Sequence, residues 1–401
     1  MRIGCDLLND IFRAYYDARR HKRNTKSQLA FEMDLEHNLI ELYEQIRDRT
    51  YRPSPGICFI TEHPVKREIF ASPFRDRVVH HLLFNYLAPL FECRMIHDSY
   101  SCRKGKGTSL GIERFEHHIR SCTRNYTRSA YILKLDLRGY FMSIDKRLLY
   151  SIIERTVGRK KGVADFDYEL TDFLLRAILF RNPVENCRII GSLSDWNDLP
   201  PSKSLLKSPP GVGLPIGDLT SQLFSNIYLD MLDEYAKRTL KCRHYGRYVD
   251  DFYIVHSSRN YLRGLIPRLR DYLSSELHLT LHPDKIVLQH STKGVSFLGA
   301  IVRPHRRYPA MRTVGLFRKA MKRLEQECFE AEPSFECLAR MLPVINSYCG
   351  HLMHFKAYRI LDRQFGASPL RKYFRFSRDY AKATIKTGYK RPSGENIRSF
   401  D

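Results

Sequence analysis

The chain has 401 residues, of which 43% are hydrophobic, and its 67 lysines and arginines against 44 aspartates and glutamates give a net charge of +23. That hydrophobic content excludes a disordered chain, and the length exceeds one typical core, so we expect two or three subdomains. Because basic residues are spread along the whole length, the composition predicts an extended polyanion, with nucleic acid the leading candidate, lying across a folded surface.

The cysteines and the apolar segments indicate in which cellular compartment the protein resides. The ten cysteines contain no Cys-x-x-Cys pair and no cluster at zinc spacing, which favours free thiols in a reducing cytoplasm. No apolar run reaches the length of a membrane span, and Met1 to Asp10 lack the apolar segment of a signal peptide. We therefore expect a cytoplasmic protein that does not contact a membrane.

The first 130 residues are predicted to combine helices with a pair of short strands. Apolar residues at helical spacing predict helices within residues 1–50: Phe31, Leu35, Leu39, Leu42 and Ile46. Strands are expected at 57–62 and 68–72, followed by a helix that Asp76 could cap. The basic loop 101–108 lacks the P-loop pattern; its glycines would let the backbone approach phosphates, or it is a solvated charged turn.

The segment Tyr131–Leu137 is predicted to be a buried strand that ends in one acidic residue, Asp136. Asp145 is expected to cap a helix over 146–154, whereas nothing helical begins directly after Asp136. Asp136 therefore lacks a capping role and is the better candidate for chemistry.

Residues 156–213 are the least regular part of the chain. They contain a predicted helix over 168–179 and then a basic, proline-rich stretch with the only tryptophan, Trp196. We expect an insertion or a long loop that becomes ordered only against a partner.

The segment Arg247–Val255 is an apolar, β-branched and aromatic run interrupted by Asp250 and Asp251. It predicts a hairpin with both carboxylates at its turn, and a solvated Asp-Asp turn is the plain alternative. Before it, Leu214–Gln222 is expected to lead into a helix capped by Asp218 or Thr220. After it we expect a helix over 259–277, a strand over 295–302, helices from residue 311, over 338–348 and over 355–365, and a basic, aromatic C-terminal segment.

A strand ending in Asp136 and a hairpin bearing Asp250 and Asp251 are the parts needed to hold two metal ions about 3.5–4 Å apart. Ionised carboxylates in apolar surroundings need a positive partner, and Mg²⁺ prefers oxygen ligands and phosphates. Asp136 is expected to bridge both ions and Asp250 to complete the site. Basic side chains that could meet a nucleoside triphosphate lie upstream: Lys66, Arg67, Arg75 and Arg77.

From about Lys66 to Gly299 the sequence resembles the reverse transcriptases, with a thumb-like helical region after it. The motifs that carry the resemblance are Leu133-Lys134-Leu135-Asp136 with Tyr140-Phe141, Leu214-Pro215-Ile216-Gly217 through Tyr228-Leu229, Tyr248-Val249-Asp250-Asp251, and Phe297-Leu298-Gly299. The resemblance implies an α+β right-hand polymerase: N-terminal helices and fingers over 1–130, palm over 131–155 and 214–305, an insertion over 156–213, and a helical thumb with a basic C-terminal extension over 306–401.

The resemblance also implies roles for single residues of an RNA-directed DNA polymerase. Asp136, Asp250 and Asp251 would be catalytic, and Asp136, Leu137 and Asp250 would hold two Mg²⁺ ions, for which Mn²⁺ could substitute. Phe141 would be the steric gate against a ribose 2′-hydroxyl, Arg67 would contact the incoming nucleotide, and Lys285 would protonate the pyrophosphate. The other implied nucleotide-binding residues are Lys66, Arg75, Ile216, Gly217 and Gln222, and the implied primer grip is Phe297, Leu298 and Gly299.

Ile216 departs from the common family pattern, in which Gln precedes the glycine. Together with Ser221-Gln222 and Ser99–Gly107, it is similar to the reverse transcriptases of diversity-generating retroelements, in which replacement of the polar residue is linked to adenine-biased misincorporation. Ile216 cannot hydrogen-bond near the nucleotide sugar, which would weaken discrimination. Alternatively, it only packs under the nucleotide.

The leading hypothesis is an enzyme that copies a structured noncoding RNA into cDNA, with template RNA, primer, dNTPs and an accessory protein as partners. A bacterial antiphage defence system is the alternative setting. A maturase or RNA chaperone that keeps the fold without the chemistry is disfavoured by intact Asp136, Asp250 and Asp251. An RNA-templated RNA polymerase is disfavoured by Phe141.

Overall fold

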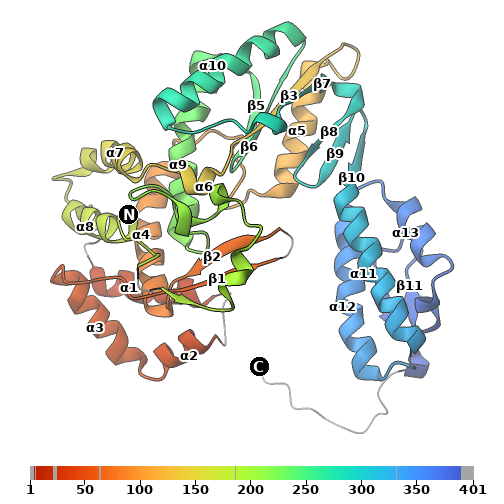
Figure 1. Ribbon diagram of the computed structural model, residues 1–401, viewed down its shortest axis with the longest axis horizontal. Helices are drawn as coiled ribbons and strands as arrows, with labels where there is room; N and C mark the ends of the chain where they lie inside the picture. The colour runs from red at the N-terminus through yellow and green to blue at the C-terminus, as the bar shows by residue number, and fades with distance from the viewer. Residues whose placement is uncertain are drawn as a thin grey trace. The chain divides into compact units, whose positions relative to one another are not determined.

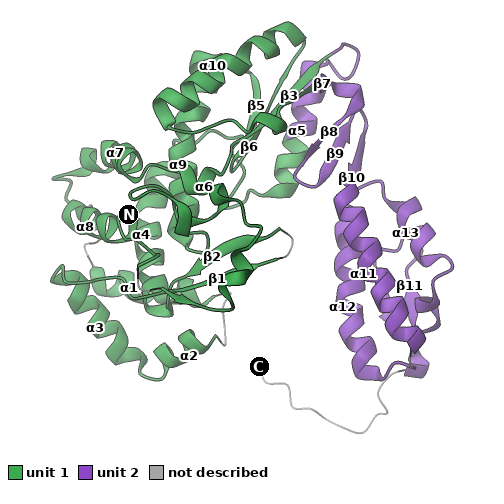
Figure 2. Cartoon of the chain, in the orientation of Figure 1, with its two compact units in different colours: residues 1–114, 130–288 green, residues 115–129, 289–401 purple. Residues whose placement is uncertain are grey.

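The computed structural model describes residues 4, 6–20, 25–62, 65–185, 187–330 and 332–389. The end of the predicted basic, aromatic C-terminal segment, from residue 390 on, lies outside them. The chain divides into two compact units (Figure 2): unit 1 is residues 1–114 and 130–288, and unit 2 is residues 115–129 and 289–401. The division passes through helix α5 (Thr108–Cys122) and strand β7 (Val287–His290). The predicted α+β class is confirmed.

Helix α3 (Leu35–Arg47) of unit 1 forms where the sequence predicts a helix. Its residues Leu39, Leu42 and Ile46 are fully buried, because helical spacing places them on one stripe that faces the core. The other helices of unit 1 are α1 (Leu7–Arg19), α2 (Lys26–Glu32), α4 (Phe74–Glu92), α6 (Tyr140–Ser143), α7 (Lys146–Val157), α8 (Tyr168–Leu179), α9 (Leu219–Glu234) and α10 (Arg259–Leu277) (Figure 1).

Two of the predicted helix caps have different outcomes. Asp145 caps α7 as predicted, because its carboxylate accepts hydrogen bonds from the backbone N–H groups of Arg147 and Leu148 at 2.8 and 3.0 Å. The prediction that Asp76 caps a helix is wrong, since α4 begins two residues earlier. The buried Asp76 carboxylate instead accepts hydrogen bonds from the Tyr51 hydroxyl at 2.9 Å and the Ser54 N–H at 2.7 Å.

The central sheet of unit 1 has the strand order β5-β6-β3-β7, with β5 (His244–Tyr248), β6 (Asp251–His256) and β3 (Tyr131–Asp136). Both β5 and β3 run antiparallel to β6. Four consecutive residues of β6 are buried, Phe252 to Val255, so both faces of this strand are covered, and α10 contacts β3 and β6. This arrangement fixes β3 against β6, with the acidic residues at one end of the sheet.

A second sheet of unit 1 has the order β2-β1-β4. Strands β1 (Ile57–Thr61) and β2 (Arg67–Ala71) form where short strands are predicted, within one residue at each end, and they pair antiparallel; β4 (Arg188–Ile189) runs parallel to β1. The fully buried Glu68 carboxylate accepts hydrogen bonds from Trp196 Nε1 (2.6 Å), Ser204 Oγ (2.7 Å) and Leu205 N (2.5 Å). The expectation that residues 156–213 become ordered only against a partner is therefore wrong, because Glu68 of β2 holds the part from Trp196 to Leu205 in place.

Unit 2 contains two small sheets, a group of helices and the second half of α5. Strands β8 (Val295–Phe297), β9 (Ala300–Arg303) and β10 (Arg306–Pro309) form an antiparallel sheet, and β11 (Phe374–Phe376) pairs with β12 (Ala383–Ile385). Helices α11 (Met311–Glu330), α12 (Phe335–Met353) and α13 (Tyr358–Phe365) pack around a core of their own. The predicted single strand over 295–302 is wrong, because Leu298 and Gly299 both have positive φ (52° and 81°) and turn the chain into a hairpin.

Among the described residues, no helix is both long enough and apolar enough to cross a lipid bilayer.

Candidate active site

Three carboxylates come together at one end of the central sheet of unit 1. In the antiparallel pairing of β3 with β6, Asp136 lies directly opposite Asp251. Tyr248 also pairs with Asp251, so Val249 and Asp250 form a two-residue turn between β5 and β6. The Leu137 N–H donates to the Asp250 carbonyl oxygen at 3.3 Å. Residues more than a hundred positions apart in the sequence are thus brought to one site by strand register.

Two lysines compensate part of the negative charge. Lys285 Nζ lies 2.9 Å from Asp136 Oδ1, and Lys134 Nζ lies 3.0 Å from Asp251 Oδ2. Burial, opposed by Lys134 and assisted by the neighbouring carboxylates, raises the pKa of Asp251 to about 7. Burial and the charge of Asp136 raise the pKa of Asp250 to about 6. The cluster therefore holds more negative charge than its surroundings stabilise.

The donor set fits a hard divalent cation. Asp251 Oδ1 is buried and has no hydrogen-bond partner among the described residues. The backbone bonds around Leu137 use the Leu137 N–H, the Arg138 N–H and the Asp136 carbonyl, and leave the Leu137 carbonyl outside them. Carboxylate and carbonyl oxygens are the ligands that Mg²⁺ prefers. In the part of the chain that is described, no three His, Cys, Asp or Glu side chains are already arranged around a metal position.

The turn that carries Asp250 is strained. Val249 has φ of 53°, a left-handed conformation that β-branched residues rarely adopt. Its N–H donates to Ser101 Oγ at 3.2 Å, and its carbonyl accepts a hydrogen bond from Arg247 Nη1 at 3.1 Å. Hydrogen bonds to the N–H and to the carbonyl of Val249 hold this residue in the left-handed conformation. They therefore fix the backbone position of the next residue, Asp250.

Arg247 is fully buried and anchors this turn to helix α9. Its guanidinium donates to both carboxylate oxygens of Asp233, from Nε at 2.8 Å and from Nη2 at 2.7 Å. The Tyr245 hydroxyl donates to the same carboxylate at 2.6 Å, and further bonds join Arg247 to Ser99 and Asn226. A two-point, buried ion pair of this kind has a defined geometry. The sequence prediction assigned no role to Arg247 or Asp233.

The predicted nucleotide-binding basic residues lie in different places. Arg67 begins β2 and is exposed, and its positive charge acts on Asp250, where it opposes the rise in pKa. Lys66 Nζ donates to the Asn197 carbonyl at 2.6 Å. Among the described residues, no contact places Arg75 beside Asp136, Asp250 or Asp251. Its guanidinium donates to Asp76 at 3.0 Å and stacks over the Tyr51 ring at 5.0 Å.

The loop before α9 is docked on strand β2. The Ile216 carbonyl accepts a hydrogen bond from the Phe70 N–H at 2.9 Å. Gly217 has φ of 143°, and a Cβ atom there would lie 2.0 Å from the Phe70 carbonyl oxygen, so only glycine fits this approach. The Ile216 side chain packs against a small apolar cluster that includes Phe70, and Gln222 is exposed on α9. The Phe141 carbonyl accepts from the Leu214 N–H at 2.8 Å, which joins Phe141 to the same loop.

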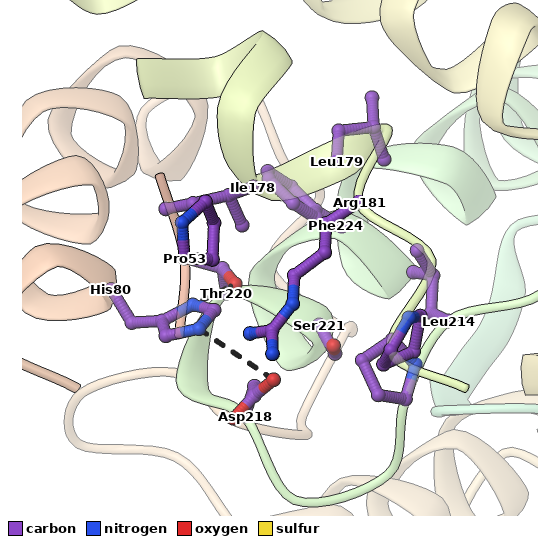
Figure 3. Close-up of a pocket in the computed structure, with 12 residues that line it drawn as sticks. Pro53, His80, Ile178, Leu179, Arg181, Leu214, Asp218, Thr220, Ser221 and Phe224 are labelled. Carbon is purple, nitrogen blue, oxygen red and sulfur yellow. Dashed lines mark hydrogen bonds and ion pairs between the residues drawn. The ribbon is translucent and has the colours of Figure 1, made fainter. Parts of the chain in front are cut away.

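A small buried pocket behind this loop is held by polar contacts (Figure 3). His80, from α4, lies with Nδ1 2.7 Å from Thr220 Oγ1 and with Nε2 3.6 Å from Asp218 Oδ2. Asp218 is at the N-cap position of α9 as predicted, but its side chain makes no capping hydrogen bond. Its carboxylate instead faces His80, so α4 and the 214–222 loop are tied together.

The predicted primer-grip residues lie in unit 2. Phe297 ends β8, and Leu298 and Gly299 form its two-residue turn into β9. The buried Phe297 ring contacts the Phe115 ring with centroids 5.4 Å apart. This contact packs the end of β8 against α5 within unit 2.

Residues 66–302, more than half of the chain, match the protein family described as "Reverse transcriptase (RNA-dependent DNA polymerase)". Protein YkfC of Escherichia coli (strain K12) is 22% identical over 329 residues, which cover 73% of this chain and 77% of that protein. The putative COX1/OXI3 intron 2 protein of Saccharomyces cerevisiae is 20% identical over 280 residues, which cover 56% of this chain and 29% of that protein.

Two solved structures show a partial likeness. Telomerase from Candida albicans in complex with a TWJ fragment of telomeric RNA has a TM-score of 0.47 at 12% identity, covering 82% of this chain and 63% of that chain. Apo telomerase from Candida tropicalis, truncated from the C-terminal domain, has a TM-score of 0.46 at 12% identity, covering 64% of this chain and 56% of that chain. This chain thus spans less than two thirds of the length of either telomerase chain.

Proposed function

The chain belongs to the reverse transcriptase family of RNA-dependent DNA polymerases, and we propose that Asp136, Asp250 and Asp251 form the centre at which it extends a DNA primer along an RNA template. Membership of this family makes the chain an RNA-directed DNA polymerase, which is a nucleotidyltransferase. The observation that carries the proposal is the register of β3 on β6, which sets Asp136 opposite Asp251 beside the Asp250 turn.

Two Mg²⁺ ions, or Mn²⁺ in their place, would be held by the carboxylates of Asp136 and Asp250 and by the Leu137 carbonyl. When bound, such ions lower the pKa of a primer 3′-hydroxyl and stabilise the charge that develops on the leaving pyrophosphate. Asp251 is held by Lys134 and adds negative charge that favours cation binding. Lys285 carries its protons 2.9 Å from Asp136 and is the residue that we expect to donate one to the pyrophosphate.

The nucleotide would be held beside the start of β2 and the 214–222 loop that is docked on this strand. Arg67 projects from the start of β2 and would pair with the triphosphate. The Phe141 ring would contact the sugar and clash with a 2′-hydroxyl. The hydrogen bond from the Leu214 N–H to the Phe141 carbonyl holds the backbone of Phe141 in place. Gly217 lets this loop approach β2 closely, and Gln222 on α9 is exposed for contact with the nucleotide. By family resemblance the hairpin of Phe297, Leu298 and Gly299 would grip the primer.

We assign the regions of a right-hand polymerase by the same resemblance: fingers with N-terminal helices over 1–130, palm over 131–155 and 214–305, and thumb over 306–401. A diversity-generating retroelement is the setting that Ile216 favours, because an apolar side chain there cannot hydrogen-bond to the substrate. Antiphage defence is the alternative setting. In both, the template would be a structured noncoding RNA, with an accessory protein as a candidate partner.

The test is primer extension by Asp250→Asn with an RNA template, dNTPs and Mg²⁺. We expect extension to be abolished while RNA binding stays close to that of the unchanged protein, because the carboxylate acts on metal and not on the template. Asp145→Asn is the matched control, since this aspartate caps α7. Extension by Asp250→Asn at the control's rate would refute the assignment, and loss of all RNA binding would point to misfolding.

A further inference from the structure

Helix α8 has a second, partly exposed face beside the one that is fully buried in the core. The core face buries Leu170, Thr171, Leu174, Leu175 and Leu179. On the other face Phe173, Arg176, Ala177 and Phe180 follow one another at helical spacing (i, i+3, i+4, i+7), so they form one row along the helix. Phe173 is half-buried and Phe180 is 42% exposed. The Phe180 ring and the Arg176 guanidinium are therefore exposed on adjacent turns, while the Phe173 ring is partly buried against the core and has the Arg49 guanidinium 5.7 Å from its centroid.

This face is one wall of an open groove of about 660 Å³ in unit 1. The opposite wall is the loop before β1, with Arg52, Pro53 and Pro55. Ala177, between the two rings on α8, carries only a methyl group and leaves the space between them open. We call this feature the α8 groove, and it is separate from the carboxylate cluster, none of whose residues line it.

The charge of the α8 groove is positive. Arg176 is 55% exposed, with Nε 2.7 Å from Asp172 Oδ2 and its guanidinium 4.4 Å from the Tyr150 ring centre, so its position is fixed. Arg52 on the facing wall is exposed. Glu185 is the carboxylate among the groove's lining residues. Arg181 separates the groove from the neighbouring buried pocket, into which its side chain points (Figure 3).

We propose that the α8 groove binds a single-stranded stretch of RNA, with bases stacked on Phe173 and Phe180 and phosphates paired with Arg52 and Arg176. Aromatic rings beside basic side chains are the combination that binds single strands without sequence preference, because every base has a π-face. The two rings are seven residues apart, about 10 Å along the helix, which is the length of roughly three stacked nucleotides. The choice of RNA over other polyanions rests on the proposed function, and the chain's net charge of +23 favours a nucleic acid.

Phe180→Ala and Arg176→Gln test the proposal with matched controls. Phe329→Ala removes a ring that is 90% exposed in unit 2. Arg238→Gln removes an arginine whose Nε bonds a carboxylate at 2.7 Å four residues away, as Arg176 does. Thermal unfolding of all four variants should match the parent protein, because none of these side chains is buried.

The measurements are the Kd for a short unstructured RNA and the sites of photocrosslinking to a 4-thiouridine RNA. Phe180→Ala should raise Kd about 5- to 150-fold, the usual effect of removing one stacking ring. Arg176→Gln should raise Kd and reduce its dependence on salt, whereas the two controls should do neither. Crosslinks in the parent protein should map to α8 around Phe173 and Phe180.

Crosslinks that miss α8, or a Kd that Phe180→Ala changes no more than Phe329→Ala does, would overturn the proposal. Capture of an acidic peptide in the groove without RNA crosslinking would also overturn it, in favour of a protein partner. Extension of a short primer–template at saturating concentration should be the same in all variants. If the parent protein extends no primer, the proposed function fails, while the crosslinking result still decides whether RNA occupies the groove.

Discussion

Removal of the Arg247 guanidinium tests how the chain holds the turn that carries Asp250. Arg247→Met leaves the Asp233 carboxylate buried and without its cation, which should lower the free energy of unfolding by about 3–5 kcal/mol. It also removes the donor that lies 3.1 Å from the Val249 carbonyl. A hydrogen bond from a charged donor is worth about 1.5–3 kcal/mol. If that energy is lost in the transition state, kcat should fall roughly 10- to 150-fold.

A triple variant separates stability from positioning. Arg247→Met, Asp233→Leu and Tyr245→Phe together remove the ion pair and the hydroxyl that bonds to it at 2.6 Å. Replacing a buried ion pair by apolar residues is often neutral, so stability should return to within about 2 kcal/mol of the parent protein. The kcat should stay low, because the Val249 carbonyl still lacks its donor.

Urea unfolding followed by circular dichroism and the kcat of primer extension at saturating dNTP measure the two effects. Arg238→Met is the control, since this exposed arginine pairs with Glu234 on the same helical segment and should change neither quantity appreciably. A triple variant that regains both stability and full kcat would refute the reasoning, because the pair would then only stabilise the fold.

Four further outcomes are expected. Gly217→Ala should raise the KM for dNTPs and destabilise the protein by more than about 2 kcal/mol, because the new Cβ meets the Phe70 carbonyl; an unchanged KM would contradict this. Phe141→Ala should admit ribonucleotides, measured as the ratio of kcat/KM for a dNTP and its NTP, and an unchanged ratio would remove Phe141 from the gate. Ile216→Gln should raise fidelity opposite template adenines, and an identical error spectrum would rule out the retroelement-type explanation. Burial lowers the pKa of Lys146 from 10.5 to about 8, so this lysine's own contribution to stability should rise with pH between these values, by at most about 3 kcal/mol; the stability of the parent protein relative to Lys146→Met should therefore increase across this range, and parallel pH profiles of the two proteins would contradict it.

The acidic cluster could be located from the sequence because its signal is local. Asp136 ends an apolar strand, and Asp250 and Asp251 interrupt another, so each departs from its own surroundings. Strand alternation also places Lys134 on the same face as Asp136. The ion pair between Lys134 and Asp251 follows only from the register of β3 on β6, which places these two residues diagonally across the strand pair.

Other features depend on contacts that no local pattern records. One more arginine in a chain with 67 basic residues is unremarkable, and only the packing of β5 on α9 shows that Arg247 is buried against Asp233. Beyond the predicted helix over 168–179, the region 156–213 has no clear periodicity, and part of its order comes from Glu68, more than a hundred residues away. The turn at Leu298 and Gly299 is not apparent in the sequence, because the apolar residues on both sides predict one continuous strand.

The most direct test of the shared cation site is to count bound Mn²⁺ by electron paramagnetic resonance. The sample is the complex with an RNA template, a dideoxy-terminated primer and the next dNTP, prepared for the parent protein and for Asp136→Asn, Asp250→Asn and Asp145→Asn. We predict two Mn²⁺ ions in the parent complex and in Asp145→Asn, and a loss of Mn²⁺ in both Asp136→Asn and Asp250→Asn. Unchanged Mn²⁺ binding in either of these two variants would contradict a site built jointly by β3 and the β5–β6 turn.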